Sequence, residues 1–100
     1  MFGLLIVFAL LFVPISANQA CDNCKLLFNF AYQFGIRGAL QNMDKFKGFY
    51  NNECQYFERQ IDGAVGKFCF ELYSKNQHKL LSDFKAVTPV GIMCTDLKQC

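Results

Sequence analysis

The chain has 100 residues, of which 53% are hydrophobic and 18% are charged, and its formal net charge is +2. This length and composition predict one compact domain and argue against a second domain or a disordered tail. The small positive charge is far below the basic excess of nucleic-acid-binding proteins, so we expect no nucleic-acid partner.

The first part of the chain, MFGLLIVFALLFVPISA, carries no charged side chain and ends in small residues. A membrane-spanning helix needs about 20 apolar residues, and the apolar run from Phe2 to Val13 is shorter than that. We therefore predict a signal peptide over residues 1–17 and a mature domain over residues 18–100, with a short membrane anchor as the alternative. The mature protein is then secreted, to the extracellular space or to the lumen of an acidic secretory or lysosome-like compartment.

The mature part has apolar residues at helical intervals of three and four. A first helix is predicted over about residues 22–38. Its buried stripe consists of Cys24, Leu27, Phe28, Ala31, Phe34 and Gly38. Three further stripes predict helices that contain Phe46 to Phe57, Ile61 to Tyr73 and Leu80 to Val87.

A short fifth helix is predicted near the C-terminal end. Thr88 suits an N-cap and Pro89 suits the first helical position, because proline has no amide hydrogen to donate, and this helix extends to about Leu97. No segment alternates with period two over more than a few residues, and the Asp62-Gly63 pair lies inside a helical stripe. The predicted fold class is therefore all-α with five helices.

All six cysteines lie in the predicted mature part. An even number of cysteines in a small secreted domain predicts three disulfides, with 15 pairings open. A redox-active Cys-x2-Cys motif belongs to a fold with strands, and a zinc site needs a second close pair of ligands, whereas the only histidine is His78. We therefore expect neither a metal nor a cofactor.

The cysteines stand in three groups, Cys21-x2-Cys24, Cys54-x14-Cys69 and Cys94-x5-Cys100, and the chain ends TPVGIMCTDLKQC, with a proline before the penultimate cysteine. This pattern resembles the saposin-like (saposin B-type) family, and among its members it looks most like the lytic amoebapores and caenopores. The resemblance implies a five-helix saposin-like fold with three disulfides. The pairs that it implies are Cys21 with Cys100, Cys24 with Cys94 and Cys54 with Cys69.

The predicted first helix also carries apolar residues outside its main stripe, namely Leu26, Phe30, Tyr32 and Ile36. A helix that is apolar on nearly all sides is buried in a larger body, packed against a partner, or in contact with lipid. The alternative to lipid contact is ordinary core packing together with a dimer interface.

Four lysines in the stretch that spans the third and fourth helices, Lys67, Lys75, Lys79 and Lys85, are candidate docking residues for anionic lipid headgroups. Each such charge is worth about 1 kcal/mol near an anionic membrane surface. The alternative is a solvated helical face on which Glu71 and Lys75 form an i,i+4 pair.

His78 is a candidate pH sensor, because its protonation in an acidic compartment would add positive charge beside Lys75 and Lys79. The alternative is an exposed histidine near a helix start. Gly63 and Gly66 are candidate hinge residues, because glycine within a helix costs up to about 1 kcal/mol relative to alanine and indicates close packing or hinging. The resemblance implies a domain that opens like a clasp.

The sequence contains no GxSxG, HExxH or phosphate-binding glycine motif, so we expect no enzyme. The resemblance and the surface residues predict a secreted protein that binds anionic membrane lipids and permeabilises membranes, including microbial ones, as an oligomer or dimer. The alternatives are a non-lytic lipid-binding or lipid-transfer protein, an activator of a lipid-degrading enzyme, and a secreted helical ligand for a protein receptor.

Overall fold

The computed structural model describes the backbone of residues 2–100 and the side chains of residues 18–100, and this part of the chain contains helices and no strand. The elements in chain order are α1 (Phe2–Gln33), the 3-10 helix η1 (Ile36–Ala39), α2 (Met43–Gln60), α3 (Gly63–Lys75), α4 (Gln77–Lys85) and α5 (Val90–Asp96). The predicted all-α class with five α-helices is confirmed. The side chains of the predicted signal peptide, residues 1–17, are not among those described, and the signal peptide stays a prediction.

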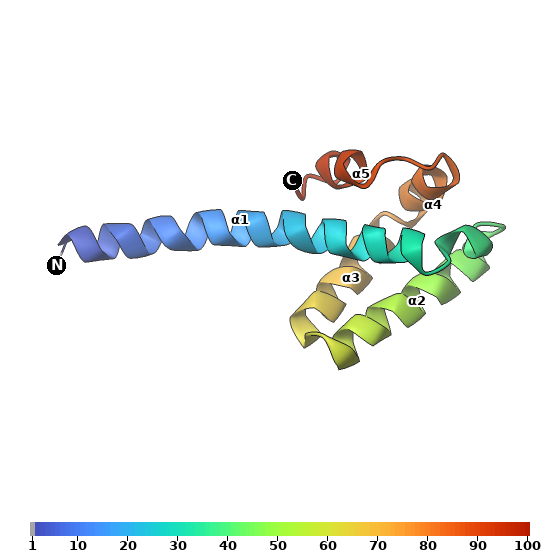
Figure 1. The fold of residues 1–100 in the computed structure, drawn as a ribbon, viewed down its shortest axis with the longest axis horizontal. Helices are drawn as coiled ribbons and strands as arrows, with labels where there is room; N and C mark the ends of the chain where they lie inside the picture. The colour runs from blue at the N-terminus through green and yellow to red at the C-terminus, as the bar shows by residue number, and fades with distance from the viewer. Residues whose placement is uncertain (1) are drawn as a thin grey trace.

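Helix α1 is the longest element, and the other helices lie along its C-terminal half (Figure 1). Helices α2 and α3 form a hairpin on one side of α1 and are the most extensively contacting pair of helices in the described chain. Helix α5 packs against α1 on the opposite side, so that the C-terminus lies beside the middle of α1.

Three disulfides close this arrangement. Cys21 pairs with Cys100 and Cys24 pairs with Cys94, which ties α1 to α5 and the C-terminal residues. The third disulfide, Cys54 with Cys69, ties α2 to α3. These are the three pairs that the resemblance implies. The enclosed loop of the third bridge spans 15 residues, for which loop entropy gives a stabilisation of about 3 kcal/mol.

Aromatic rings from four helices form the centre of the core. Phe28 of α1 meets Tyr73 of α3 and Phe84 of α4 edge to face, with ring centroids 5.6 Å and 5.7 Å apart. Phe46 of α2 contacts the ring of Tyr73 in the same geometry. All four rings are fully buried, and each such pair adds about 1 kcal/mol beyond the burial of its area.

The first helix begins and ends earlier than the sequence predicts, at Phe2 rather than at about residue 22 and at Gln33 rather than at about residue 38. Helix α1 stops at Gln33, because Gly35 adopts a left-handed backbone conformation with φ of 102°, and the chain continues into η1. Phe34 is therefore not on the buried stripe; its side chain is 63% exposed, while Ile36 turns inward and is fully buried. Gly38 lies on the exposed side of η1.

The predicted third helix also begins two residues too early, because Ile61 and Asp62 form the corner between α2 and α3. Ile61 is the exposed C-cap of α2, and the Asp62 side chain accepts a hydrogen bond from the Ala64 amide at 2.7 Å, which caps the start of α3. The Asp62-Gly63 pair is thus at a corner rather than inside a helix. At the start of α2, the Asn42 side chain likewise accepts a hydrogen bond from the Lys45 amide.

The last two helices differ from the prediction at one end each. Helix α4 stops at Lys85, and Val87, predicted on its buried stripe, is half-exposed with φ of 55°. The N-cap of α5 is Pro89 rather than Thr88, so this helix begins one residue later. The Thr88 carbonyl instead accepts a hydrogen bond from the Tyr32 hydroxyl at 2.8 Å, which joins the α4–α5 connection to α1.

Candidate functional site

The four candidate docking lysines lie on two consecutive helices. Lys67 and Lys75 are on α3, Lys79 and Lys85 are on α4, and all four side chains are exposed. Their ammonium groups can therefore reach an external anion without rearrangement of the core.

Lys79 differs from the other three because it is already paired. Its Nζ donates to Asp83 Oδ2 at 3.0 Å and lies 3.5 Å from Asp96 Oδ2, so it links α4 to α5. The hydrogen bond to Asp83 is the main cause that raises the pKa of Lys79. With one positive and two negative charges, this triplet is negative as a whole, which makes Lys79 the weakest of the four candidates.

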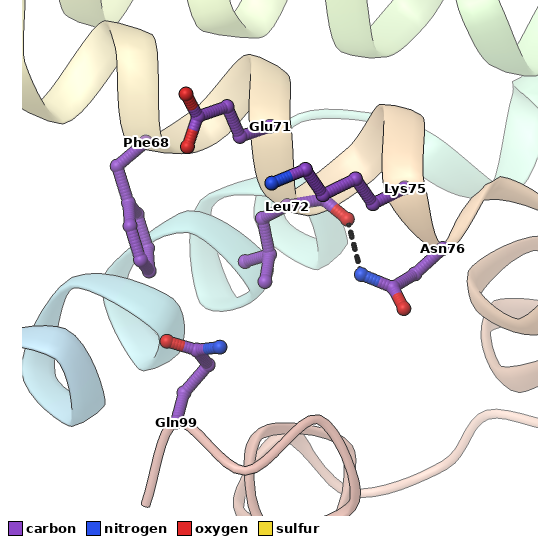
Figure 2. Close-up of a pocket in the computed structure, with 6 residues that line it drawn as sticks. All are labelled: Phe68, Glu71, Leu72, Lys75, Asn76 and Gln99. Carbon is purple, nitrogen blue, oxygen red and sulfur yellow. Dashed lines mark hydrogen bonds between the residues drawn. The ribbon is translucent and has the colours of Figure 1, made fainter.

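Lys75 lies on the wall of a cavity of about 230 Å³ between α3 and the C-terminal residues. Figure 2 shows that Phe68, Glu71, Leu72 and Lys75 line it from α3, while Gln99 faces them from the other side. The Asn76 side chain closes one end and donates a hydrogen bond to the Leu72 carbonyl at 2.8 Å. The structure gives no ion pair between Glu71 and Lys75, so the i,i+4 pair of the alternative interpretation, a solvated helical face, is not formed.

The candidate pH sensor and hinge residues occupy three different environments. His78 is the second residue of α4 and its side chain is exposed. Gly63 is the first residue of α3, and a Cβ atom placed there would meet no heavy atom within 4 Å. Gly66 is buried, and a Cβ atom placed there would lie 2.6 Å from the Glu58 Cα atom, so this glycine permits the close approach of α3 to α2.

Six large apolar side chains are exposed on the described surface. Two of them, Phe34 and Tyr56, belong with Phe30 to a group of three aromatic residues that we call the aromatic ladder. The apolar set is Leu26, Phe34, Tyr56, Ile61, Val87 and Ile92. In the ladder, the Phe30 ring of α1 stacks on Phe34 at a centroid distance of 4.3 Å and on Tyr56 of α2 at 5.5 Å. Phe34 and Tyr56 are 63% and 46% exposed, so aromatic surface faces solvent where α1 meets α2.

A buried carboxyl group lies next to the ladder. Glu53 of α2 is only 3% exposed, and its Oε1 accepts a hydrogen bond from the Tyr73 hydroxyl at 2.7 Å. Its second oxygen, Oε2, is buried without a hydrogen-bond partner. Burial raises the pKa of Glu53 to about 8, although the hydrogen bond from Tyr73 acts in the opposite direction.

The sequence places Glu53 only at the edge of its helical stripe, and it does not reveal the pair with Tyr73. The sequence does contain one indication that Glu53 is buried, because it lies between Tyr50 and Cys54, both of which are buried on the same helix. The partner hydroxyl comes from another helix, however, and no spacing along the chain indicates it. The sequence does not predict the ladder as a unit either, because the helical stripe places Phe34 in the core.

Within the described part of the chain, no group of three or more histidine, cysteine or acidic side chains is placed to hold a metal ion. No helix in the described range is both long and apolar enough to cross a membrane. Three disulfides are typical of proteins in oxidising compartments, and this is compatible with a secreted protein.

Comparison of the chain with protein-family models, with curated proteins and with solved structures gives no match.

Proposed function

We propose that this protein is a secreted, saposin-like protein that binds anionic lipids and permeabilises membranes, with microbial membranes as its target. The observation that supports the proposal best is the aromatic surface at the junction of α1 and α2. A small disulfide-braced helical domain has an apolar core of its own, and an additional exposed ladder of stacked rings marks an interaction surface.

The proposed mechanism begins with electrostatic attraction by the exposed lysines Lys67, Lys75 and Lys85. Exposed aromatic side chains then enter the interface between headgroups and acyl chains, where rings with a polar edge are favoured. Opening of the domain would expose further core surface. Gly63 lies at the α2–α3 corner, and a Cβ atom placed there would meet no heavy atom within 4 Å, so it is the better candidate hinge of the two glycines.

The test uses the protein recovered from a secreting expression host, with its disulfides intact and its N-terminus sequenced. Dye-filled vesicles of anionic and of neutral lipid are exposed to it at pH 5 and pH 7, and dye leakage and lipid transfer are recorded in parallel. Dose-dependent leakage from the anionic vesicles that is lost on reduction of the disulfides supports the proposal. The N-terminal sequence tests separately whether residues 1–17 are removed.

A non-lytic lipid carrier, or an activator that presents lipid to a lipid-degrading enzyme, is the second candidate function. The observation in its favour is a cavity of about 300 Å³ beside the aromatic ladder, large enough to hold an apolar ligand in the closed domain. Lipid transfer without leakage would select this function. Absence of binding to either vesicle would refute both and favour a protein receptor.

A further inference from the structure

The cavity of about 230 Å³ beside α3 carries one acidic and one basic side chain on the same wall. Glu71 and Lys75 both come from α3, and the Gln99 amide faces this wall from the C-terminal residues (Figure 2). Phe68 and Leu72 form the apolar part of the lining. Both charged side chains are exposed, so a ligand in the cavity can reach them.

Glu71 and Lys75 do not neutralise each other, although their positions favour an ion pair. Glutamate four residues before lysine is the more favourable order for such a pair on a helix. Lys79 and Asp83 on α4 have the less favourable order and nevertheless pair at 3.0 Å. Among the described residues, neither Glu71 nor Lys75 has an ion-pair partner. Both charges are therefore available to a ligand.

This pair of charges determines which ligands suit the cavity. Glu71 repels an anion, Lys75 repels a cation, and an uncharged ligand leaves both side chains without a charged partner. A zwitterion satisfies both, and the apolar surface of Phe68 and Leu72 lowers the local dielectric constant, which strengthens each contact. A volume of about 230 Å³ lies below the usual range of ligand pockets, so it suits a headgroup without its acyl chains.

The geometry of the wall restricts the zwitterion further. Residues four apart on a helix have Cβ atoms about 5–6 Å apart, so ligand charges separated by several bonds match better than the closely spaced charges of an α-amino acid. The Gln99 amide nitrogen donates to the Leu97 carbonyl at 3.1 Å, and its oxygen is left to accept. A primary ammonium can donate both to this oxygen and to the Glu71 carboxylate, whereas a trimethylated ammonium has no hydrogen to donate.

We propose that this cavity binds one phosphoethanolamine group, with its ammonium at Glu71 and Gln99 and its phosphate at Lys75. The group occurs in soluble glycerophosphoethanolamine and as the headgroup of phosphatidylethanolamine. A site that selects this zwitterion goes beyond the general attraction of the lysines to anionic lipid. Only the lipid as its source rests on the proposed membrane function, because the soluble compound needs no membrane.

The first arm of the test titrates soluble compounds into the disulfide-bonded protein, without vesicles, and follows its amide resonances by NMR. Glycerophosphoethanolamine should bind saturably and shift the resonances of Glu71, Lys75 and Gln99. Glycerophosphocholine, ethanolamine, dimethyl phosphate and glycine should each bind at least about threefold more weakly, because each lacks one of the contacts or the spacing between the charges.

A double variant tests the two charged side chains at constant net charge. Glu71→Gln with Lys75→Gln should lower the affinity for glycerophosphoethanolamine at least about tenfold, because both charge contacts are lost. The matched control, Lys47→Gln with Glu58→Gln, changes two side chains of α2 outside the cavity and should leave this affinity unchanged. All four side chains are exposed, so both variants keep the packing of the core.

The second arm compares vesicles that hold equal amounts of anionic lipid together with either phosphatidylethanolamine or phosphatidylcholine. The natural protein should co-sediment more strongly with the first, and the variant Glu71→Gln with Lys75→Gln should bind both alike. A preference in the first arm alone supports the site with the soluble compound as its ligand. Equal affinity for glycerophosphoethanolamine and glycerophosphocholine, or unchanged binding by the double variant, would overturn the proposal whether or not anionic vesicles leak.

Discussion

The Glu53 side chain shows how a single residue can couple the stability of this protein to pH. Burial raises the pKa of its carboxyl to about 8 in the folded protein, while the unfolded chain has the ordinary value near 4.5. Between these values the unfolded chain has released the proton and the folded protein still holds it. Rising pH therefore favours the unfolded state across this window.

We predict that ionisation of Glu53 lowers the free energy of unfolding by up to about 1.4 kcal/mol per pH unit between pH 5 and pH 8. Below pH 4.5 the carboxyl is protonated in both states and its contribution is complete, and above about pH 8 it is ionised in both states, so the decline stops. Urea unfolding followed by circular dichroism at half-unit pH steps measures this profile.

The matched control is Glu53→Gln, which keeps the size of the side chain and an oxygen that can accept the Tyr73 hydroxyl hydrogen. This variant cannot ionise, so the decline between pH 5 and pH 8 should be absent. Parallel profiles for the two proteins would mean that Glu53 is already ionised when the protein is folded.

The two candidate hinge glycines should respond differently to the same substitution. Gly66→Ala places a methyl group against the Glu58 backbone, and we predict a loss of about 1–3 kcal/mol, because α2 and α3 must move apart. Gly63→Ala adds a methyl group in open space and should change stability by less than about 1 kcal/mol. Thermal unfolding of both variants checks this. An equal loss in the two would mean that α3 does not approach α2 as closely as described.

At the scale of the helices, the C-terminal ends of α4 and α5 share a feature that propensity does not predict. Each helix end is followed by a residue other than glycine that has positive φ, and backbone hydrogen bonds span that residue. The residue is Val87 after α4 and Lys98 after α5. The Thr88 amide donates to the Asp83 carbonyl at 2.9 Å, and the Gln99 amide donates to the Cys94 carbonyl at the same distance. This geometry normally uses glycine, and a β-branched residue there is strained.

We predict that Val87→Gly stabilises the protein by about 1 kcal/mol, because glycine adopts positive φ without a steric penalty. The half-exposed valine side chain contributes little burial to offset this gain. Val87→Ala keeps a Cβ atom and should gain much less, so it is the appropriate control. Chemical denaturation of the three proteins makes the comparison, and equal stability of the glycine and alanine variants would contradict the strain argument.

Helical periodicity predicts the existence of the helices better than their ends. Cys24, Leu27, Phe28 and Ala31 are fully buried, as one stripe of a continuous helix requires. The end of α1 depends on the conformation of Gly35, and a glycine within an apolar pattern does not by itself indicate where a helix stops. The disulfide pairs could be predicted only through the family resemblance, because six cysteines allow 15 pairings.

At the scale of the whole molecule, exposure of the four lysines follows from their polar helix faces, whereas their electrostatic partners depend on how the helices meet. The contact of Lys79 with Asp96 joins α4 to α5, and no spacing along the chain indicates it. The buried pair of Glu53 and Tyr73 likewise needs α2 and α3 to be docked. The sequence thus predicts which charged side chains are present, and the tertiary structure determines which of them have an ion-pair or hydrogen-bond partner.

Because Lys79 is paired with acidic side chains and the other three lysines are not, the four lysines should contribute unequally to docking on anionic membranes. Lys67→Gln, Lys75→Gln and Lys85→Gln should each lower the affinity for anionic vesicles about fivefold at low salt, since each charge contributes about 1 kcal/mol. Asp96→Asn should raise that affinity, because it removes a negative charge from the triplet and leaves Lys79 with Asp83 alone. Vesicle co-sedimentation measures both effects, with neutral vesicles and high salt as controls in which all variants should bind alike. If Asp96→Asn binds no better than the natural protein, the face formed by α4 and α5 does not approach the membrane, and docking depends on α3.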